Sequence, residues 1–425
     1  MNYKSLIVAT SLTVSPHILA ADYIVTFAPE DDAHALTNAD KITAYKKTND
    51  KNIERLFQSF PNLQNQFAIK KNLWAAGSVV MDLNSEQAQA LRREAFIKNV
   101  APDQKRHFLI APTSVTSEAD PSQAWSLEYL QIAKVREKYP EALGTGIRVG
   151  VLDTGIQSRH AEFAETGGVV FKDFVNNLPF PYDDHGHGTH VAGTISGVNV
   201  GVAPASSLTI GKILSASGSA FDSWILEGMQ WMLDPDGDPA TDDFPQVINN
   251  SWGGDLEDGP IDFDSYAAFH QTIQNWVDLG IIPVFAAGNS GSSPNGFPAA
   301  FPEVLSIGAL DQSAEVAAFS SRGPNLWSLD QMIFSVAKPD FSLPGVDIVS
   351  AGPANDYALM SGTSMAAPHG VGILALYLQF AKKADVKAAK TALIKYSERK
   401  NDLSFGLGIP NTVELIGSKA SSEPR

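Results

Sequence analysis

Three short stretches of the sequence supply a carboxylate, an imidazole and a hydroxyl that could act together. Asp153 ends the apolar run of "VGVLDTGI", His187 lies in "DDHGHGTHVAGTISG", and Ser364 lies in "SGTSMAAPHG". A serine hydroxyl is a weak nucleophile and needs a base to take its proton. The base in turn needs a carboxylate that holds its tautomer and stabilises the imidazolium. These residue types indicate acyl transfer through a serine nucleophile.

The residues around Ser364 are small, and a helix is predicted to begin at Ser364 or Met365. At that place backbone N–H groups are free and the helix dipole favours developing negative charge. Small residues are also typical of a buried helix start. Taken with the other two stretches, they are interpreted as space for the backbone of a substrate.

The first two stretches also fit other chemistries. Asp153-Thr154-Gly155 is typical of aspartic proteases, but that mechanism needs two carboxylates that share a proton, and this sequence has one such triplet. His185, His187 and His190 have a spacing that can supply zinc ligands. Zinc hydrolysis would be abolished by a chelator, whereas serine hydrolysis would be abolished by a serine-directed reagent.

The order Asp153, His187, Ser364 is the subtilisin order. The motifs "VLDTGI", "HGHGTHVAGT" and "SGTSMAAPH" resemble those of the subtilisin family of secreted serine proteases, and "VINNSWGG" resembles bacillopeptidase F-like members. The similarity runs from about residue 123 to about residue 410. It implies that Asp153, His187 and Ser364 form a catalytic triad.

The resemblance also implies roles for neighbouring residues. Asn289 and the backbone N–H of Ser364 would stabilise the oxyanion. The implied substrate-binding residues are Ser251, Trp252 and Gly253 at a strand edge, and Ala286, Ala287, Gly288 and Gly296 in a pocket. Because these pocket residues are small, we expect a roomy and mainly apolar pocket. The acidic residues that follow the edge, Asp255, Glu257 and Asp258, are interpreted as a solvated loop, with an outer subsite for basic residues as the alternative.

This chemistry requires no cofactor, but two features bear on structural calcium. Asp234, Asp236 and Asp238 alternate in "LDPDGDPATDDF", which fits either Ca²⁺ ligands or an acidic surface loop. The segment between "HVAGT" and "GVAP" is shorter than the family's calcium-binding loop, and Glu162 stands where a liganding aspartate is typical. The family's strong calcium site is therefore not expected in its usual form.

Apolar runs such as "IRVGVLDTG", "QVINNSWGG" and "IIPVFAAGN" alternate with helical stretches. This pattern predicts an α/β fold with a doubly wound, mostly parallel sheet and helices on both faces. Ligands of such sheets bind beyond the carboxyl ends of the strands. A small α+β domain is predicted to precede this fold.

We expect four segments along the chain. Residues 1–21 have the positive flank, apolar run and small residues of a signal peptide. Residues 22–110 resemble the family's propeptide, with a permanent accessory domain as the alternative. Residues 111–122 are Pro/Ser/Thr/Ala-rich and are interpreted as a linker. Residues 123–425 would form the catalytic domain.

Composition narrows the partners of the protein. The net charge of −16 argues against nucleic acid, and no later apolar run is long enough for a membrane anchor. The absence of cysteine excludes thiol catalysis and disulfides. We therefore expect a secreted endopeptidase, extracellular or periplasmic, made as a zymogen that acts on protein or peptide substrates and is inhibited by its own propeptide. The alternative is an inactive subtilisin-like binding protein, against which the intact Asp153, His187, Ser364 and Asn289 argue.

Overall fold

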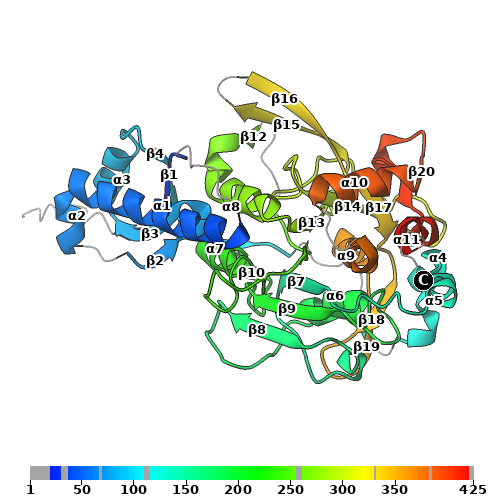
Figure 1. The fold of residues 1–425 in the computed structure, drawn as a ribbon. Helices are drawn as coiled ribbons and strands as arrows, with labels where there is room; N and C mark the ends of the chain where they lie inside the picture. The colour runs from blue at the N-terminus through cyan, green and yellow to red at the C-terminus, as the bar shows by residue number, and fades with distance from the viewer. Residues whose placement is uncertain are drawn as a thin grey trace, which may run out of the picture.

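The computed structural model describes residues 20–29, 37–66, 69–109, 115–117, 119–254, 261–329, 332–381 and 385–420. They form a small N-terminal unit and a larger α/β unit (Figure 1). Most of the predicted signal peptide lies outside the described residues, as do Asp255, Glu257 and Asp258.

The N-terminal unit is a four-stranded antiparallel sheet with helices on it. In spatial order its strands are β2 (Lys71–Leu73), β3 (Ser78–Leu83), β1 (Ala21–Phe27) and β4 (Ile97–Pro102). Its helices are α1 (Asn38–Ser59), α2 (Pro61–Gln66) and α3 (Ser85–Leu91), with the 3-10 turn η1 (Trp74–Ala76). Capping boxes at Thr37/Asp40 and Asn84/Gln87 satisfy free N–H groups where α1 and α3 begin.

A seven-stranded parallel sheet forms the centre of the larger unit. Its order is β17 (Phe341–Pro344), β14 (Leu305–Leu310), β13 (Ile282–Ala286), β11 (Val247–Asn250), β7 (Arg148–Asp153), β9 (Ser207–Lys212) and β8 (Val169–Asp173). Almost every residue of the inner strands is buried, which explains their continuous apolar runs. The predicted fold class is confirmed.

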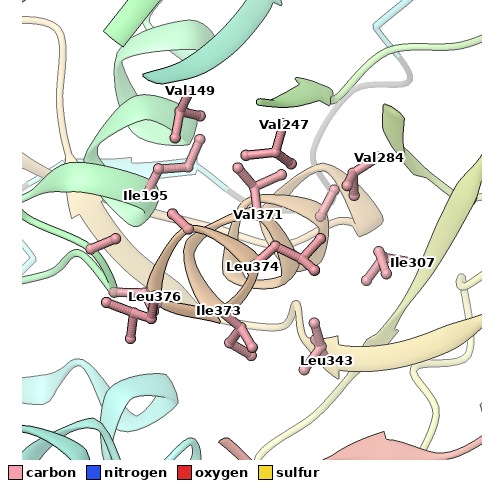
Figure 2. Close-up of a cluster of buried hydrophobic side chains, with 14 of the residues drawn as sticks. Val149, Ile195, Val247, Val284, Ile307, Leu343, Val371, Ile373, Leu374 and Leu376 are labelled. Carbon is pink, nitrogen blue, oxygen red and sulfur yellow. The ribbon is translucent and has the colours of Figure 1, made fainter. Parts of the chain in front are cut away.

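Helices cover both faces of this sheet. On one face α6 (His187–Ser196) and α9 (Thr363–Ala381) share an apolar core with Val149, Val247 and Val284. Figure 2 shows α9 surrounded by this core, with Val371 and Leu374 directed towards the strands. On the other face α7 (Asp222–Trp231) and α8 (Ala267–Asp278) share a second core with alternate strand residues. The sheet therefore holds the N-termini of α6 and α9 in place.

The N-terminal unit packs on the α7 and α8 side, because Ile42, Leu73 and Ala75 belong to the same apolar cluster as those helices (Figure 1). Polar contacts also cross this boundary. The side-chain amide of Asn275 donates to the carbonyl of Ala75 (2.8 Å), and Lys71 pairs with Glu227.

Short elements complete the described chain. The remaining strands are β5 (Lys105–His107), β6 (Val115–Ser117), β10 (Ser219–Phe221), β12 (Ile261–Asp262), β15 (Gly323–Leu329), β16 (Met332–Lys338), β18 (Ile348–Ala351), β19 (Tyr357–Met360), β20 (Ser397–Glu398) and β21 (Ile409–Pro410). The remaining helices are α4 (Trp125–Tyr129), α5 (Ile132–Lys138), α10 (Val386–Lys395) and α11 (Thr412–Ala420), and the 3-10 turns are η2 (Pro121–Gln123), η3 (Ala161–Phe163), η4 (Phe263–Tyr266) and η5 (Leu403–Phe405). Within the expected linker, β6 pairs with β19. Across the described ranges, no helix has both the length and the apolar character needed to cross a bilayer.

Candidate active site

Asp153 and His187 form a buried pair at the carboxyl edge of the sheet. Asp153 is the last residue of β7, and His187 is the first residue of α6. His187 Nδ1 lies 2.8 Å from Asp153 Oδ1, and the two residues are 1% and 0% exposed. Burial alone would lower the pKa of His187, but the negative charges of Asp153 and Asp183 outweigh it and the pKa is raised. The pair therefore has the form of an oriented general base.

Ser364 is the second residue of α9, so its backbone N–H belongs to the first turn and has no partner within the helix. Its hydroxyl donates to the carbonyl of Ser251 (3.1 Å), and the hydroxyl of Ser251 donates to the carbonyl of Ser364 (2.8 Å). The hydroxyl of Ser364 is therefore directed towards Ser251 in this structure. Helix α9 packs against α6, which begins at His187.

The three clustered histidines do not form a metal site. His190 is fully buried and its Nε2 lies 3.0 Å from the carbonyl of Ile348, while burial lowers its pKa to about 3. Burial and the neighbouring His187 lower the pKa of His185. Within the described part of the chain, no group of metal-ligating side chains includes any of the three. His190 is thus a neutral core residue.

Asp183 is a buried carboxylate beside this pair that the sequence analysis did not single out. Its Oδ1 accepts from the hydroxyl of Thr154 (2.8 Å) and from Gly186 N–H (2.8 Å), and its Oδ2 accepts from Thr189 N–H (2.8 Å). Burial raises its pKa, but these hydrogen bonds outweigh burial and lower it. It therefore remains charged and fixes the turn that leads into α6. The feature of the sequence that could have identified Asp183 is its position just before the start of a helix.

Asn289 lies beside Ser364, and both residues line the same cavity. Its Oδ1 accepts from the backbone N–H and from the hydroxyl of Thr363, both at 2.9 Å. This fixes the amide so that Nδ2 faces the other way, next to Gly362, where an added Cβ would lie 3.4 Å from it.

The predicted edge and pocket residues converge at Ser364. The cavity there is small and not the roomy pocket expected, and it is lined by Phe108, Trp252, Gly253, Gly254, Ala286, Gly288, Asn289, Gly296, Thr363 and Ser364. Ala287 is fully buried and contributes through its carbonyl, which accepts from Gly296 N–H (3.1 Å). A Cβ at Gly296 would lie 2.8 Å from the carbonyl oxygen of Gly254, so a side chain cannot be accommodated there.

The chain's own segment from Lys105 to Leu109 pairs with the edges of this cavity. Its strand β5 is antiparallel to β10. The carbonyl of Phe108 then accepts from Gly253 N–H (3.0 Å), and Phe108 N–H donates to the carbonyl of Gly218 (2.9 Å). The ring of Phe108 meets Trp252 edge to face. This is the arrangement of an extended peptide added to a strand edge.

Comparison with known proteins matches residues 144–409 to the model of the subtilase family, a range that contains Asp153, His187, Asn289 and Ser364. The chain belongs to the subtilase family. It is 36% identical to subtilisin DY of Bacillus licheniformis over 244 residues, which cover 55% of this chain and 77% of that protein. It is 37% identical to subtilisin E of Bacillus subtilis (strain 168) over 245 residues, 55% of this chain and 56% of the relative. M-protease of Shouchella clausii is 33% identical over 304 residues, 70% of this chain and 68% of the relative. This subtilase is accordingly a serine endopeptidase.

The acidic loop of this subtilase differs from the expected calcium set. Within the described residues the carboxylates close enough to share a cation are those of Asp234, Asp236 and Asp243, not that of Asp238. The loop turns back on itself, since Asp243 Oδ2 accepts from Asp236 N–H (2.8 Å). Lys46 of the N-terminal unit lies 2.5 Å from Asp234 Oδ2. An ammonium group thus already compensates part of this charge.

Glu162 holds the short segment after α6 through hydrogen bonds. Its Oε2 accepts from Asn199 N–H (2.8 Å), its Oε1 accepts from the side chain of Asn199 (2.7 Å), and Tyr357 donates its hydroxyl to Oε1 (2.6 Å). All three of these hydrogen bonds come from protein donors, and Glu162 is fully buried. The Glu162 carboxylate of this subtilase therefore has a structural role, because it fixes the short segment that follows α6.

Proposed function

We propose that this subtilase is a secreted endopeptidase made as a zymogen, with Asp153, His187 and Ser364 as triad and Asn289 in the oxyanion hole. The observation that supports it best is the buried His187–Asp153 hydrogen bond at the same sheet edge as Ser364. The proposed segments are a signal peptide at 1–21, a propeptide at 22–110, a linker at 111–122 and the catalytic domain from 123. The proposed substrates are proteins and peptides.

In this mechanism Ser364 Oγ attacks the scissile carbonyl carbon while His187 Nε2 takes its proton. Asp153 stabilises the imidazolium through Nδ1–H. The oxyanion is stabilised by the Ser364 backbone N–H and Asn289 Nδ2. Collapse of the intermediate breaks the C–N bond, and the leaving amine takes the proton from His187. Water, activated by the same histidine, then hydrolyses the acyl ester and frees Ser364.

The zymogen proposal is supported by the segment Lys105–Leu109, which lies between β10 and Gly253. We call the space between these two backbone edges the groove. Lys105–Leu109 takes up the two backbone edges that a substrate needs, so it inhibits for as long as it stays there. The residues that follow, 110–114, lie outside the described ranges. We expect the activating cut in the stretch directly after Leu109.

The proposed chemistry is tested by treating the active protein with a sulfonyl fluoride and, separately, with a chelator. We expect the sulfonyl fluoride to abolish casein hydrolysis and to add its mass to the peptide that contains Ser364. The chelator should leave hydrolysis intact, because no metal takes part in the reaction. Loss of activity with chelator alone would instead favour the zinc mechanism.

The chelator arm also tests structural calcium at the acidic loop, which stays a prediction. The melting temperature is compared before and after chelation, in wild type and in Asp234→Asn. A fall that added Ca²⁺ reverses in wild type alone would support bound calcium at this loop.

Replacing Asn289 is expected to lower kcat by roughly 10²- to 10³-fold with little change in KM, a general figure that was measured in a subtilisin. Two variants separate its two contacts. Asn289→Ala loses the acceptor for Thr363 and the donor for the oxyanion, whereas Asn289→Asp keeps the acceptor and loses the donor. We expect both to lose activity. Wild-type rates in Asn289→Asp would show that Asn289 only positions Thr363.

A further inference from the structure

The segment Lys105–Leu109 lies in the groove as a substrate strand would, so its side chains report what the groove accepts. Across the antiparallel pair, Arg106 stands opposite Ala220 and His107 opposite Ser219. These pairings fix which side chain of the strand reaches which part of the groove wall. Successive side chains of a strand point to opposite sides, so Arg106 and Lys105 address different surroundings.

Arg106 reaches a carboxylate in the wall of the groove. Its Nη2 lies 2.9 Å from Oδ2 of Asp222, the first residue of α7 and the residue directly after β10. The side chain of Asp222 is 7% exposed, while that of Arg106 is 43% exposed. The carboxylate therefore belongs to the wall, and the guanidinium comes to it from the solvent side.

The surroundings of Asp222 make a cationic partner favourable. Burial raises its pKa to about 6, Arg106 counteracts this, and the nearby carboxylate of Asp103 adds to the rise. Asp103 belongs to the N-terminal unit as well, and its Oδ1 accepts from Ser223 N–H (2.9 Å). Both of these partners would leave with the N-terminal unit. The partly buried carboxylate of Asp222 would then lack a counter-charge. A cationic side chain would stabilise it through a charge-assisted hydrogen bond, which is stronger than a neutral one.

We propose that Asp222 is a specificity-determining residue, which binds an arginine or lysine side chain of the substrate at the position that Arg106 takes here. The inference rests on the proposed function, because a substrate has to follow the register of Lys105–Leu109. A glutamate at the same position would meet a buried like charge. The small pocket at Ser364 then selects near the cut, and Asp222 selects farther from it on the N-terminal side.

The test uses peptides that copy residues 103–114 and the active protein obtained from the full chain. Four peptides carry Arg, Lys, Gln or Glu at the position of Arg106. A fifth keeps Arg106 and carries Lys105→Gln, which removes the same charge from the neighbouring side of the strand. The rate of cleavage gives kcat/KM, and the fragment masses show that the same bond is cut in each.

We expect the Arg106→Gln peptide to lose about tenfold in kcat/KM, which corresponds to about 1.4 kcal/mol. The Glu peptide should lose more, the Lys peptide less, and the Lys105→Gln peptide less than about twofold, since exposed charges contribute little. In Asp222→Asn the ratio between the Arg and Gln peptides should fall to about one.

Equal kcat/KM for the Arg, Gln and Glu peptides would overturn the inference, and Asp222 would then only anchor the N-terminal unit. This comparison needs no variant of the enzyme, so it holds even when Asp222→Asn does not fold. Casein measures the proposed function separately. Failure to cut casein would reject that function, whereas casein hydrolysis without preference among the peptides would reject only the role of Asp222.

Discussion

A Ser364→Ala chain is expected to keep its N-terminal unit and to hydrolyse no casein. Without the hydroxyl no acyl ester forms, and the oxyanion donors and His187 have no nucleophile to assist. Loss of such a nucleophile lowers kcat by about 10⁶-fold, a general figure that was measured in a subtilisin. Wild type should shed about a quarter of its 425 residues, and chain mass and casein hydrolysis over time measure both effects.

Ser361→Ala is the matched control for this experiment. Ser361 lies in the same motif, but its hydroxyl faces Asp347, whose N–H donates to it (2.8 Å). This variant should be processed and should cut casein. Melting temperatures show whether Ser364→Ala is folded. A folded Ser364→Ala chain that still loses its N-terminal unit by itself would contradict the role given to Ser364.

The second large effect is expected for Asp153→Asn, which should lower kcat by about 10⁴-fold. The asparagine can hold the wrong tautomer of His187 and cannot stabilise its imidazolium.

The pH profile of Asp153→Asn should change as well. Burial lowers the pKa of His187 and the charges of Asp153 and Asp183 raise it more, so removing Asp153 lowers it. A general base works when neutral, so activity falls as pH drops through that pKa. The acid limb of kcat/KM should therefore move to lower pH.

The variant Asp183→Asn removes a charge near His187 without removing a hydrogen bond to it. Asp183 raises the pKa of His187 only through space, whereas Asp153 is hydrogen-bonded to it. We expect a smaller shift of the acid limb in Asp183→Asn and a far smaller loss of kcat. An unchanged acid limb and near wild-type kcat in Asp153→Asn would reduce Asp153 to a turn residue, held there by Thr154 N–H, which donates to its Oδ1 (2.7 Å).

Much of the site follows from local patterns in the sequence. Asp153 was predicted to end an apolar strand and Ser364 to lie where a helix begins, because apolar runs and small residues mark these places, and the structure has both. The hairpin β15–β16 was not predicted, because Met332 and Ile333 are exposed (66% and 64%) and contribute no core pattern. Asp243 replaces Asp238 in the acidic cluster because a loop without regular structure has no period from which to read its side-chain directions. The Arg106–Asp222 pair joins residues 116 positions apart, which no local pattern encodes.

The covalent link between the N-terminal unit and the rest of the chain sets the local concentration of the segment Lys105–Leu109 at the groove. While the chain is intact, a tethered segment faces its site at an effective concentration on the order of millimolar. Once the bond beyond Leu109 is cut, that concentration becomes the bulk concentration of the fragment. Ion pairs of the boundary such as Lys46–Asp234 and Lys71–Glu227 have partly exposed lysine side chains and are screened by salt. The proposed cleavage would therefore not by itself free the groove: dilution and ionic strength would decide how long the severed fragment still occupies it.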